Sequence, residues 1–244
     1  MSETLFIANW KLNHNISSTE SYIDKIQNYQ NDNAKIIICP PYPLLNNFNN
    51  KKLTNISFGS QNIAANESGA FTGEVHAELL CDFNCKYAII GHSERREFFN
   101  ENDNDVNLKI KIAQKHNLTP ILCIGETKNE REANAYIDII TKQLDIALND
   151  IDTSRNIIIA YEPIWSIGTG LIPNNQQIEE VFDLIQSKTT LLNLDKNKIK
   201  ILYGGSANVK NLASLIEIPN IDGFLIGSAS LEADNLMKMA DFVK

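Results

Sequence analysis

The chain has 244 residues, of which 43% are hydrophobic, and a formal net charge of −8 from 22 Lys and Arg against 30 Asp and Glu. This composition excludes a disordered chain, a collagen and a membrane-embedded protein, and the acidic balance argues against a broad nucleic-acid surface, which needs a basic face. At roughly 150 residues per domain, the length fits either one large α/β barrel or two smaller domains.

The cysteines and the N-terminus indicate the compartment. Four cysteines are too few and too unevenly spaced for the disulfide framework of a small secreted domain, and they stand at Cys39, Cys81, Cys85 and Cys123. The first residues, MSETLFIANWK, contain no basic region, and no segment reaches the roughly 20 apolar residues that span a bilayer. We therefore expect a soluble, cytoplasmic protein without a membrane partner.

Eight short apolar runs rich in Ile, Leu and Val predict strands. They cover residues 4–9, 35–40, 55–61, 86–92, 119–125, 156–163, 200–205 and 222–227. The runs are continuous rather than alternating, which is typical of parallel strands covered on both faces. Eight such strands separated by helix-length segments predict an α/β fold, a closed (βα)8 barrel with outer helices, in which residues 1–244 form a single domain.

An open, doubly wound sheet is the alternative fold. Its dinucleotide fingerprint, G-x-G-x-x-G, would follow the first strand. Asn9, Trp10 and Lys11 stand at that place instead, so the barrel is favoured.

Two helices are indicated by apolar residues at spacings of three and four. One stripe consists of Ala133, Ile137, Ile140, Leu144 and Leu148, and the other of Ile178, Val181, Phe182 and Ile185. Capping boxes predict helix starts at residues 17–20 (SSTE) and, more weakly, at residues 174–177 (NNQQ).

Residues 61–73 (QNIAANESGAFTG) form an unusually long connection that carries turn residues and the exposed-looking pair Phe71 and Thr72. Long loops inside a compact domain are usually functional or bind something. The alternative is a loop that packs on its own barrel.

The active site of a (βα)8 barrel forms where the strands end, so polar residues just past the apolar runs are informative. These residues are Asn9, Lys11, His92, Ser93, Glu94, Glu126, Glu162, Ser206 and Ser228. Seven of the eleven glycines, at 91, 125, 168, 170, 204, 205 and 227, also lie at strand ends, which suggests backbone that approaches a ligand closely.

The ends of the seventh and eighth strands predict an anion site. Residues 204–206 (GGS) and the pair Gly227 and Ser228 can offer backbone N–H groups to a phosphate. Lys11 adds the cation that an acidic protein needs to attract such a substrate. The alternatives are glycines that only make tight turns and a lysine that is only solvated.

His92 and Glu162 are the candidates for acid–base chemistry. His92 opens the predicted helix after the fourth strand, where the helix dipole disfavours imidazolium, so a neutral ring can donate to a carbonyl oxygen. Glu162 ends an apolar run and is either paired or poised as a base. A structural histidine in the core is the alternative for His92.

The segment that follows Glu162, residues 163–170 (PIWSIGTG), carries Trp165 and two glycines. It is typical of a lid that closes over a site and excludes water. For Trp165 an anchor in the core is the alternative.

No cofactor motif accompanies these residues. Cys81 and Cys85 lack a second Cys or His pair for zinc, so we expect no metal, and no G-x-S-x-G nucleophile elbow occurs. One base, one neutral electrophile, one cation and an anion cradle suit proton abstraction next to the carbonyl of a small phosphorylated compound. An inactive phosphate-binding barrel and a Schiff-base aldolase using Lys11 are the alternatives.

Six segments together are similar to the triosephosphate isomerase family. They are ANWKLN (8–13), QNIAANESGAFTGEV (61–75), IIGHSERR (89–96), ILCIGET (121–127), AYEPIWSIGTG (160–170) and YGGS (203–206). The resemblance covers essentially the whole chain and implies a TIM barrel. It also implies a homodimer without cofactor that interconverts dihydroxyacetone phosphate and D-glyceraldehyde 3-phosphate through an enediolate, in glycolysis and gluconeogenesis.

The resemblance also implies roles for single residues. Glu162 corresponds to the base, His92 to the neutral electrophile, Lys11 to the cation that stabilises the enediolate, and Asn9 to an orienting residue. Glu94 corresponds to a carboxylate near the lysine and Ser93 to the resting partner of the base. The positions that bind phosphate are Gly168, Ser206, Gly227 and Ser228. Loop 61–75 corresponds to a dimer loop in which Thr72 reaches the partner subunit's Asn9.

Three features depart from the family pattern. Ser228 stands where a second glycine is common, and Ile164 and Ser166 replace Val and Ala in the lid. Pro173 occupies the place whose amide would bind the tyrosine corresponding to Tyr203, and proline has no N–H. We therefore expect a changed balance between open and closed lids.

Overall fold

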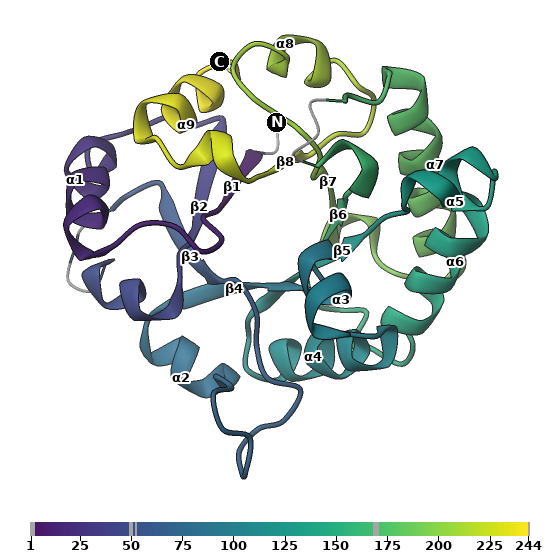
Figure 1. Cartoon of the computed structure of the whole chain (residues 1–244), viewed down its shortest axis with the longest axis horizontal. Helices are drawn as coiled ribbons and strands as arrows, with labels where there is room; N and C mark the ends of the chain where they lie inside the picture. The colour runs from purple at the N-terminus through teal and green to yellow at the C-terminus, as the bar shows by residue number, and fades with distance from the viewer. Residues whose placement is uncertain (1–2, 49–50, 52, 168–170, 244) are drawn as a thin grey trace.

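A computed structural model of the chain describes residues 3–48, 51, 53–167 and 171–243. Its eight strands close into one barrel in chain order, as Figure 1 shows in a view through the ring. The strands are β1 (Thr4–Asn9), β2 (Ala34–Cys39), β3 (Ile56–Ser60), β4 (Cys85–Ile90), β5 (Thr119–Ile124), β6 (Ile157–Tyr161), β7 (Ile199–Tyr203) and β8 (Gly223–Ile226).

All neighbouring strands pair in parallel, and β8 returns to β1 with Leu5 opposite Gly223. The predicted (βα)8 barrel is therefore confirmed, and each predicted strand ends within two residues of its expected bounds. The prediction succeeds because every strand is buried on both faces, which requires a continuous apolar run.

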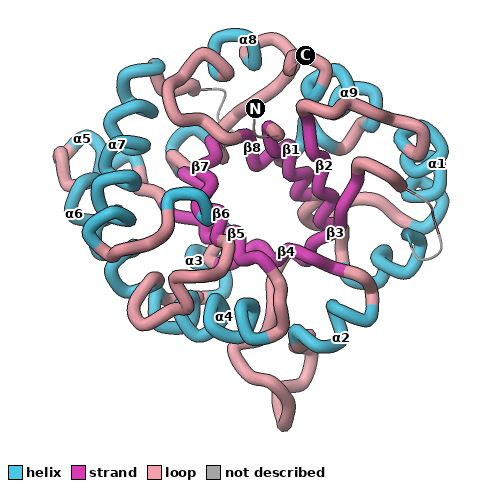
Figure 2. The backbone as a smooth tube through the Cα atoms, turned by 180° about the vertical axis from the view of Figure 1, so that it is seen from behind, coloured by secondary structure: helices cyan, strands magenta, loops and turns pink. Residues whose placement is uncertain are grey.

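Helices surround the barrel (Figures 1 and 2). The α-helices are α1 (Ile16–Ile26), α2 (Ala77–Asp82), α3 (Ser93–Phe99), α4 (Asp103–Lys115), α5 (Lys128–Glu132), α6 (Tyr136–Ala147), α7 (Asn175–Leu191), α8 (Leu212–Leu215) and α9 (Ala233–Ala240). The 3-10 helices are η1 (Tyr42–Phe48), η2 (Ile164–Ser166), η3 (Lys196–Lys198) and η4 (Ser228–Ser230).

One of the two predicted helix starts is correct. Asn174 caps α7, and its side chain and that of Gln177 form the expected reciprocal pair. The start at residues 17–20 is wrong by two residues, because Asn15 is the N-cap of α1 and forms its capping box with Ser18. Both positions offer the same i, i+3 spacing of polar side chains, so spacing alone does not choose between them.

The predicted apolar stripes differ in outcome. Ile178 and the other three residues of its stripe are buried on α7. In the earlier stripe, Ile137 is 48% exposed, and Ala133 belongs to the end of α5. The left-handed backbone of Asn134, with φ 55°, separates α5 from α6, so Ala133 is not part of this helix. Ile140 and Leu144 are buried on α6 as predicted.

Two layers of apolar side chains make up the core. Ile7, Ile37, Ile89 and Ile121 are among the residues that fill the barrel interior. A larger cluster, including Phe6, Val106 and Phe182, fills the space between the barrel and the helices. This packing fixes the strand ends, which carry the polar side chains predicted to do the chemistry.

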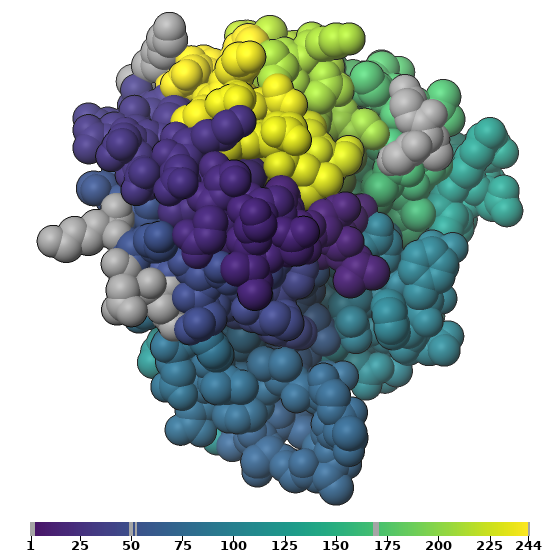
Figure 3. Space-filling view, turned by 60° about the vertical axis from the view of Figure 1, so that its left-hand side comes forward, coloured from purple at the N-terminus to yellow at the C-terminus, as the bar shows by residue number. Residues whose placement is uncertain are grey.

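The segment 61–76 contains no helix or strand and projects beyond the ring of helices (Figures 1 and 2). Figure 3 shows it as part of a protrusion from the body of the molecule. Phe71, within this segment, is 48% exposed, so about half of its side chain faces solvent. Among the described residues, no helix is long and apolar enough to cross a membrane.

Candidate active site

A cavity of about 500 Å³ opens at the carboxyl ends of the strands. Its lining includes Asn9, Lys11, His92, Glu162, Ser206, Gly227 and Ser228, so the structure brings together seven of the predicted residues from five strand ends. Glu94 reaches this group through Lys11. Gly168 and Gly170 lie outside the described residues.

Glu162 and His92 are buried neighbours in this cavity. Glu162 directly follows β6, and its N–H donates to the carbonyl of Ile124 at 2.7 Å, which fixes its backbone. Its Oε1 lies 3.1 Å from Nε2 of His92, and its Oε2 accepts the Ser93 N–H at 3.0 Å. Only 2% of Glu162 and 5% of His92 are exposed, so little water surrounds the pair.

The hydrogen bonds of His92 assign its tautomer. The residue is the N-cap of α3, and its Nδ1 accepts the N–H of Glu94 at 3.2 Å. An accepting Nδ1 leaves the proton of a neutral imidazole on Nε2, the nitrogen that faces Glu162. In this tautomer, His92 can act as a hydrogen-bond donor in the cavity.

Lys11 is held in an unusual backbone conformation, with φ 51°. Its N–H donates to Oδ1 of Asn9 at 3.1 Å, and Nε2 of Gln61 donates to its carbonyl at 2.9 Å. Its Nζ lies 2.6 Å from Oε1 of Glu94. Left-handed backbone at a residue other than glycine persists only when its surroundings fix it, and these three contacts do so.

Gln61 is a residue of this site that sequence reasoning missed. Its Nε2 also donates to the carbonyl of Cys39 at 2.9 Å, so one amide group joins the ends of β1, β2 and β3. Its place at the end of the predicted strand 55–61 was the available signal. Its two acceptors are backbone carbonyls, however, and the sequence does not show which carbonyls lie nearby.

The opposite wall of the cavity is formed by the segments after β7 and β8. Oγ of Ser206 donates to the carbonyl of Ser166 at 2.6 Å. Gly227 and Ser228 lead into η4, and a β-carbon at Gly227 would meet only Lys11, at 3.4 Å from Cε. This stretch of backbone is therefore open to an incoming ligand.

The inference that the strand-end glycines serve ligand approach is wrong for several of them. A β-carbon at Gly125 would lie 1.7 Å from the Glu162 carbonyl oxygen, and one at Gly205 would lie 2.2 Å from Oη of Tyr203. Gly91 has φ 72° and would meet Arg96 at 2.9 Å. At these positions glycine is needed because neighbouring protein groups come too close for any side chain.

Glu126 is fully buried behind the cavity. Its Oε1 accepts hydrogen bonds from Oη of Tyr161 at 3.0 Å and from Nε1 of Trp165 at 2.9 Å. Burial raises the pKa of this carboxyl group, and the two hydrogen bonds and Arg131 oppose the rise. Trp165 is half-buried, and its hydrogen bond to Glu126 holds it at the end of β5. It therefore has features of both a lid residue and a core anchor.

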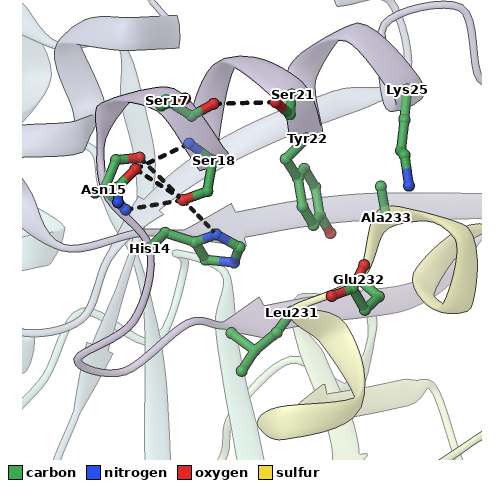
Figure 4. Close-up of a pocket in the computed structure, with 10 residues that line it drawn as sticks. All are labelled: His14, Asn15, Ser17, Ser18, Ser21, Tyr22, Lys25, Leu231, Glu232 and Ala233. Atoms are coloured by element: carbon green, nitrogen blue, oxygen red, sulfur yellow. Dashed lines mark hydrogen bonds between the residues drawn. The ribbon is translucent and has the colours of Figure 1, made fainter.

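Figure 4 shows another cavity, of about 390 Å³, between α1 and the segment that joins η4 to α9. His14 lies in its wall with its ring centroid 4.2 Å from that of Trp10. This packing half-buries His14, and burial lowers its pKa. None of the predicted catalytic or substrate-binding residues lines this cavity.

Neither the cysteines nor other ligand-type side chains form a cluster among the residues that the structure describes. No group of three or more His, Cys, Asp or Glu residues is arranged to hold a metal ion there. All four cysteines are free, and Cys39 and Cys123 point into the apolar barrel interior.

Sequence comparisons agree with this geometry. A family described as triosephosphate isomerase matches residues 4–243. The triosephosphate isomerases of Endomicrobium trichonymphae and Clostridium novyi (strain NT) are 39% and 40% identical to the chain, and all of each chain is covered. That of Mesomycoplasma hyorhinis is 40% identical, with 98% of both chains covered.

Proposed function

The chain belongs to the triosephosphate isomerase family and interconverts dihydroxyacetone phosphate and D-glyceraldehyde 3-phosphate, and we propose which of its residues carry out this reaction. Glu162 is the base, His92 the electrophile and Lys11 the cation. The observation that supports this assignment best is the 3.1 Å contact between Glu162 Oε1 and the Nε2 of His92. A base and a hydrogen-bond donor there meet at one point of the cavity, as the reaction requires.

The proposed reaction begins when Glu162 removes a proton from the substrate carbon next to the carbonyl. The carbonyl oxygen takes over the Nε2 hydrogen bond of His92, and negative charge develops on that oxygen as the enediolate forms. One proton then passes from the hydroxyl of the neighbouring oxygen to the former carbonyl oxygen, relayed by Nε2 of His92. Glu162 returns the carbon-bound proton to the former carbonyl carbon, so the carbonyl group moves by one carbon. The residues supply the base and the electrophile themselves, so the reaction needs no cofactor.

Lys11, Asn9 and Glu94 orient the substrate in this proposal. The ammonium group of Lys11 attracts the phosphorylated substrate locally, although the protein as a whole carries a charge of −8. The 2.6 Å ion pair with Glu94 keeps that group in place. An aldolase that used Lys11 as a Schiff base is disfavoured, because such a lysine needs an apolar environment.

The phosphate group is assigned to the wall formed by Ser206, Gly227 and Ser228, together with Gly168 by family resemblance. Backbone N–H groups and hydroxyls suit phosphate oxygens. Ser228 keeps the backbone donor of the glycine that is common at this position and adds a hydroxyl on the cavity side.

We also infer a homodimer formed through loop 61–75, with Thr72 near the partner subunit's Asn9. Large apolar side chains that are well exposed support this interface: Leu12 (97%), Phe71 (48%), Phe98 (66%) and Phe99 (65%). Apolar surface of this kind commonly marks a protein interface. A dimer would cover these side chains.

Sedimentation of the wild type, Phe71→Glu and Leu191→Glu at micromolar concentration tests the dimer. Leu191 is 74% exposed at the end of α7, far from loop 61–75 in the sequence, and serves as the matched control. We expect dimers for the wild type and the control and dissociation for Phe71→Glu. A monomeric wild type would contradict the inference.

The setting of the enzyme is likewise proposed. Residues 1–244 form a single domain that works in the cytoplasm, where its substrates serve glycolysis, gluconeogenesis and the pentose phosphate pathway. The free cysteines suit a reducing compartment.

A coupled assay of glyceraldehyde 3-phosphate turnover tests the assignment of the base. Glu162→Asp withdraws the carboxylate by about one bond length, and a misplacement of about 1 Å is expected to lower kcat roughly 100-fold. Glu217→Asp, at an exposed glutamate, is the control. Equal activity in the wild type and Glu162→Asp, or none in the wild type, would remove Glu162 from its role.

A further inference from the structure

Two buried hydroxyl groups behind the active site lack a hydrogen-bond partner of normal geometry among the residues that the structure describes. Ser166 ends η2, and Tyr203 ends β7, and neither side chain is exposed. Within the described part of the chain, neither Oγ of Ser166 nor Oη of Tyr203 makes a hydrogen bond of normal length and angle. The two hydroxyls interact only weakly with each other. Buried polar groups are rarely left unpaired, so this pair calls for an explanation.

Both hydroxyls lie next to Gly205. A β-carbon placed on Gly205 would be 2.2 Å from Oη of Tyr203 and 2.6 Å from Oγ of Ser166. Burial raises the pKa of Tyr203 to about 12, and the neighbouring hydroxyl of Ser166 opposes that rise. The hydroxyls therefore face one another across the small space that glycine leaves at position 205.

This space lies between Ser166, in the turn that follows Glu162, and the segment 203–206. The turn is held by the Ser166 N–H, which donates to the Pro163 carbonyl at 2.8 Å. Ser206 joins the two segments through its hydrogen bond to the Ser166 carbonyl. Ser166 is thus connected to Glu162 through the short turn 163–166 and to the segment 203–206 through Ser206.

We propose that Ser166 is a positioning residue of the isomerisation, whose hydroxyl pairs with that of Tyr203 when a phosphate group binds to Ser206. Phosphate oxygens are strong acceptors and compete with the Ser166 carbonyl for the Ser206 O–H. Once Ser206 turns to the phosphate, the Ser166–Tyr203 pair holds the turn against segment 203–206. The inference rests on the proposed roles of Glu162 and Ser206 and adds a link between them.

The experiment compares Ser166→Ala, Tyr203→Phe and the double variant on two substrates. D-Glyceraldehyde 3-phosphate is assayed for kcat and KM, and D-glyceraldehyde, which has no phosphate, is assayed by exchange of its carbon-bound proton in D2O. We expect Ser166→Ala to lower kcat for the phosphorylated substrate about tenfold, since small misplacements of a base are costly. Exchange of D-glyceraldehyde should stay within about twofold of the wild type.

The double variant shows whether the two hydroxyls act together. If they form a pair, Ser166→Ala has little further effect in the Tyr203→Phe background, because the pair is already lost. An equal fold-loss in both backgrounds would overturn the proposal. So would an equal loss of activity on the two substrates, which indicates a general structural effect.

Ser60→Ala is the matched control. Ser60 ends β3, is also fully buried and also has an unpartnered hydroxyl within the described residues. Its removal should leave both activities within about twofold of the wild type, since replacing an unpaired buried hydroxyl is close to neutral. A tenfold loss of kcat in this control would mean that removing any unpaired buried hydroxyl lowers activity. That result would overturn the role assigned to Ser166.

Glu162→Gln separates this proposal from the assignment of the base. If Glu162→Gln is inactive while Ser166→Ala equals the wild type, only the hydroxyl pair is overturned. If Glu162→Gln retains activity, the proposed role of Glu162 fails, and with it the link that Ser166 is inferred to make.

Discussion

Gly125 and Glu162 are in such close contact that no other residue fits at position 125. A β-carbon there would lie 1.7 Å from the carbonyl oxygen of Glu162 and 3.3 Å from its α-carbon. The end of β5 thus serves as the surface on which the backbone of Glu162 rests. The carboxylate of Glu162 can take its position because Gly125, at the end of the neighbouring strand, has no side chain.

Gly125→Ala is therefore expected to displace Glu162 and to lower kcat of the folded protein by roughly 100-fold, the cost of about 1 Å of misplacement. Gly223→Ala is the matched control, because its β-carbon would lie 2.1 Å from the Leu5 carbonyl oxygen, at the other end of the strands. Both changes should lower the Tm. If kcat per folded molecule fell equally in both, the specific role of Gly125 would be contradicted.

Lys11→Met removes the cation from the cavity and leaves Glu94 unpaired. We expect kcat/KM to fall by about 30-fold or more, because losing one partner of a close charge pair at a binding site costs about 2–5 kcal/mol, and about 1.4 kcal/mol is tenfold. The remaining activity should also depend less on salt, since the attraction of the phosphorylated substrate is gone. Steady-state kinetics at several ionic strengths measure both effects.

Lys25→Met provides the comparison for Lys11. Lys25 pairs with Asp234 at 2.8 Å on the exposed surface, so the change removes an equal charge away from the proposed site. Its kinetics should match those of the wild type. Equal losses in the two variants would mean that net charge, and not the position of Lys11, attracts the substrate.

Glu126 gives stability a dependence on pH. Burial raises its pKa in the folded protein, so the folded state favours the protonated carboxyl. The stabilisation is complete below the unfolded value of about 4.5 and is lost as the pH rises through the raised pKa. The Tm of Glu126→Gln minus that of the wild type should therefore increase from pH 4.5 to pH 8. A difference that falls with pH in scanning calorimetry would contradict this.

Pro173 bears on the movement of the lid expected from family resemblance. Its missing N–H cannot bind Tyr203, whose hydroxyl has no partner among the described residues. Pro173→Ala supplies an N–H, so the closed lid should become more populated and its opening slower. Fluorescence of Trp165 after a temperature jump, with a phosphorylated substrate analogue bound, measures this exchange. Unchanged lid kinetics would refute the expectation.

The sequence determined the barrel and most of the candidate site. Strands buried on both faces must be apolar throughout, so their bounds can be read from the chain. Because every parallel strand ends on the same side of a barrel, polar residues after the runs, such as Lys11, His92 and Glu162, had to meet. The roles proposed for these residues rest on their side-chain types.

The tertiary structure decided what depends on neighbours from distant parts of the chain. It showed that Gly125 is required by Glu162, that Gln61 holds the Lys11 carbonyl, and that the hydroxyls of Ser166 and Tyr203 face each other. The spacing of apolar residues and the capping residues along the chain determine where helices and strands form and end. They do not set which carbonyl, hydroxyl or β-carbon comes within a few ångströms, because packing between elements fixes those distances.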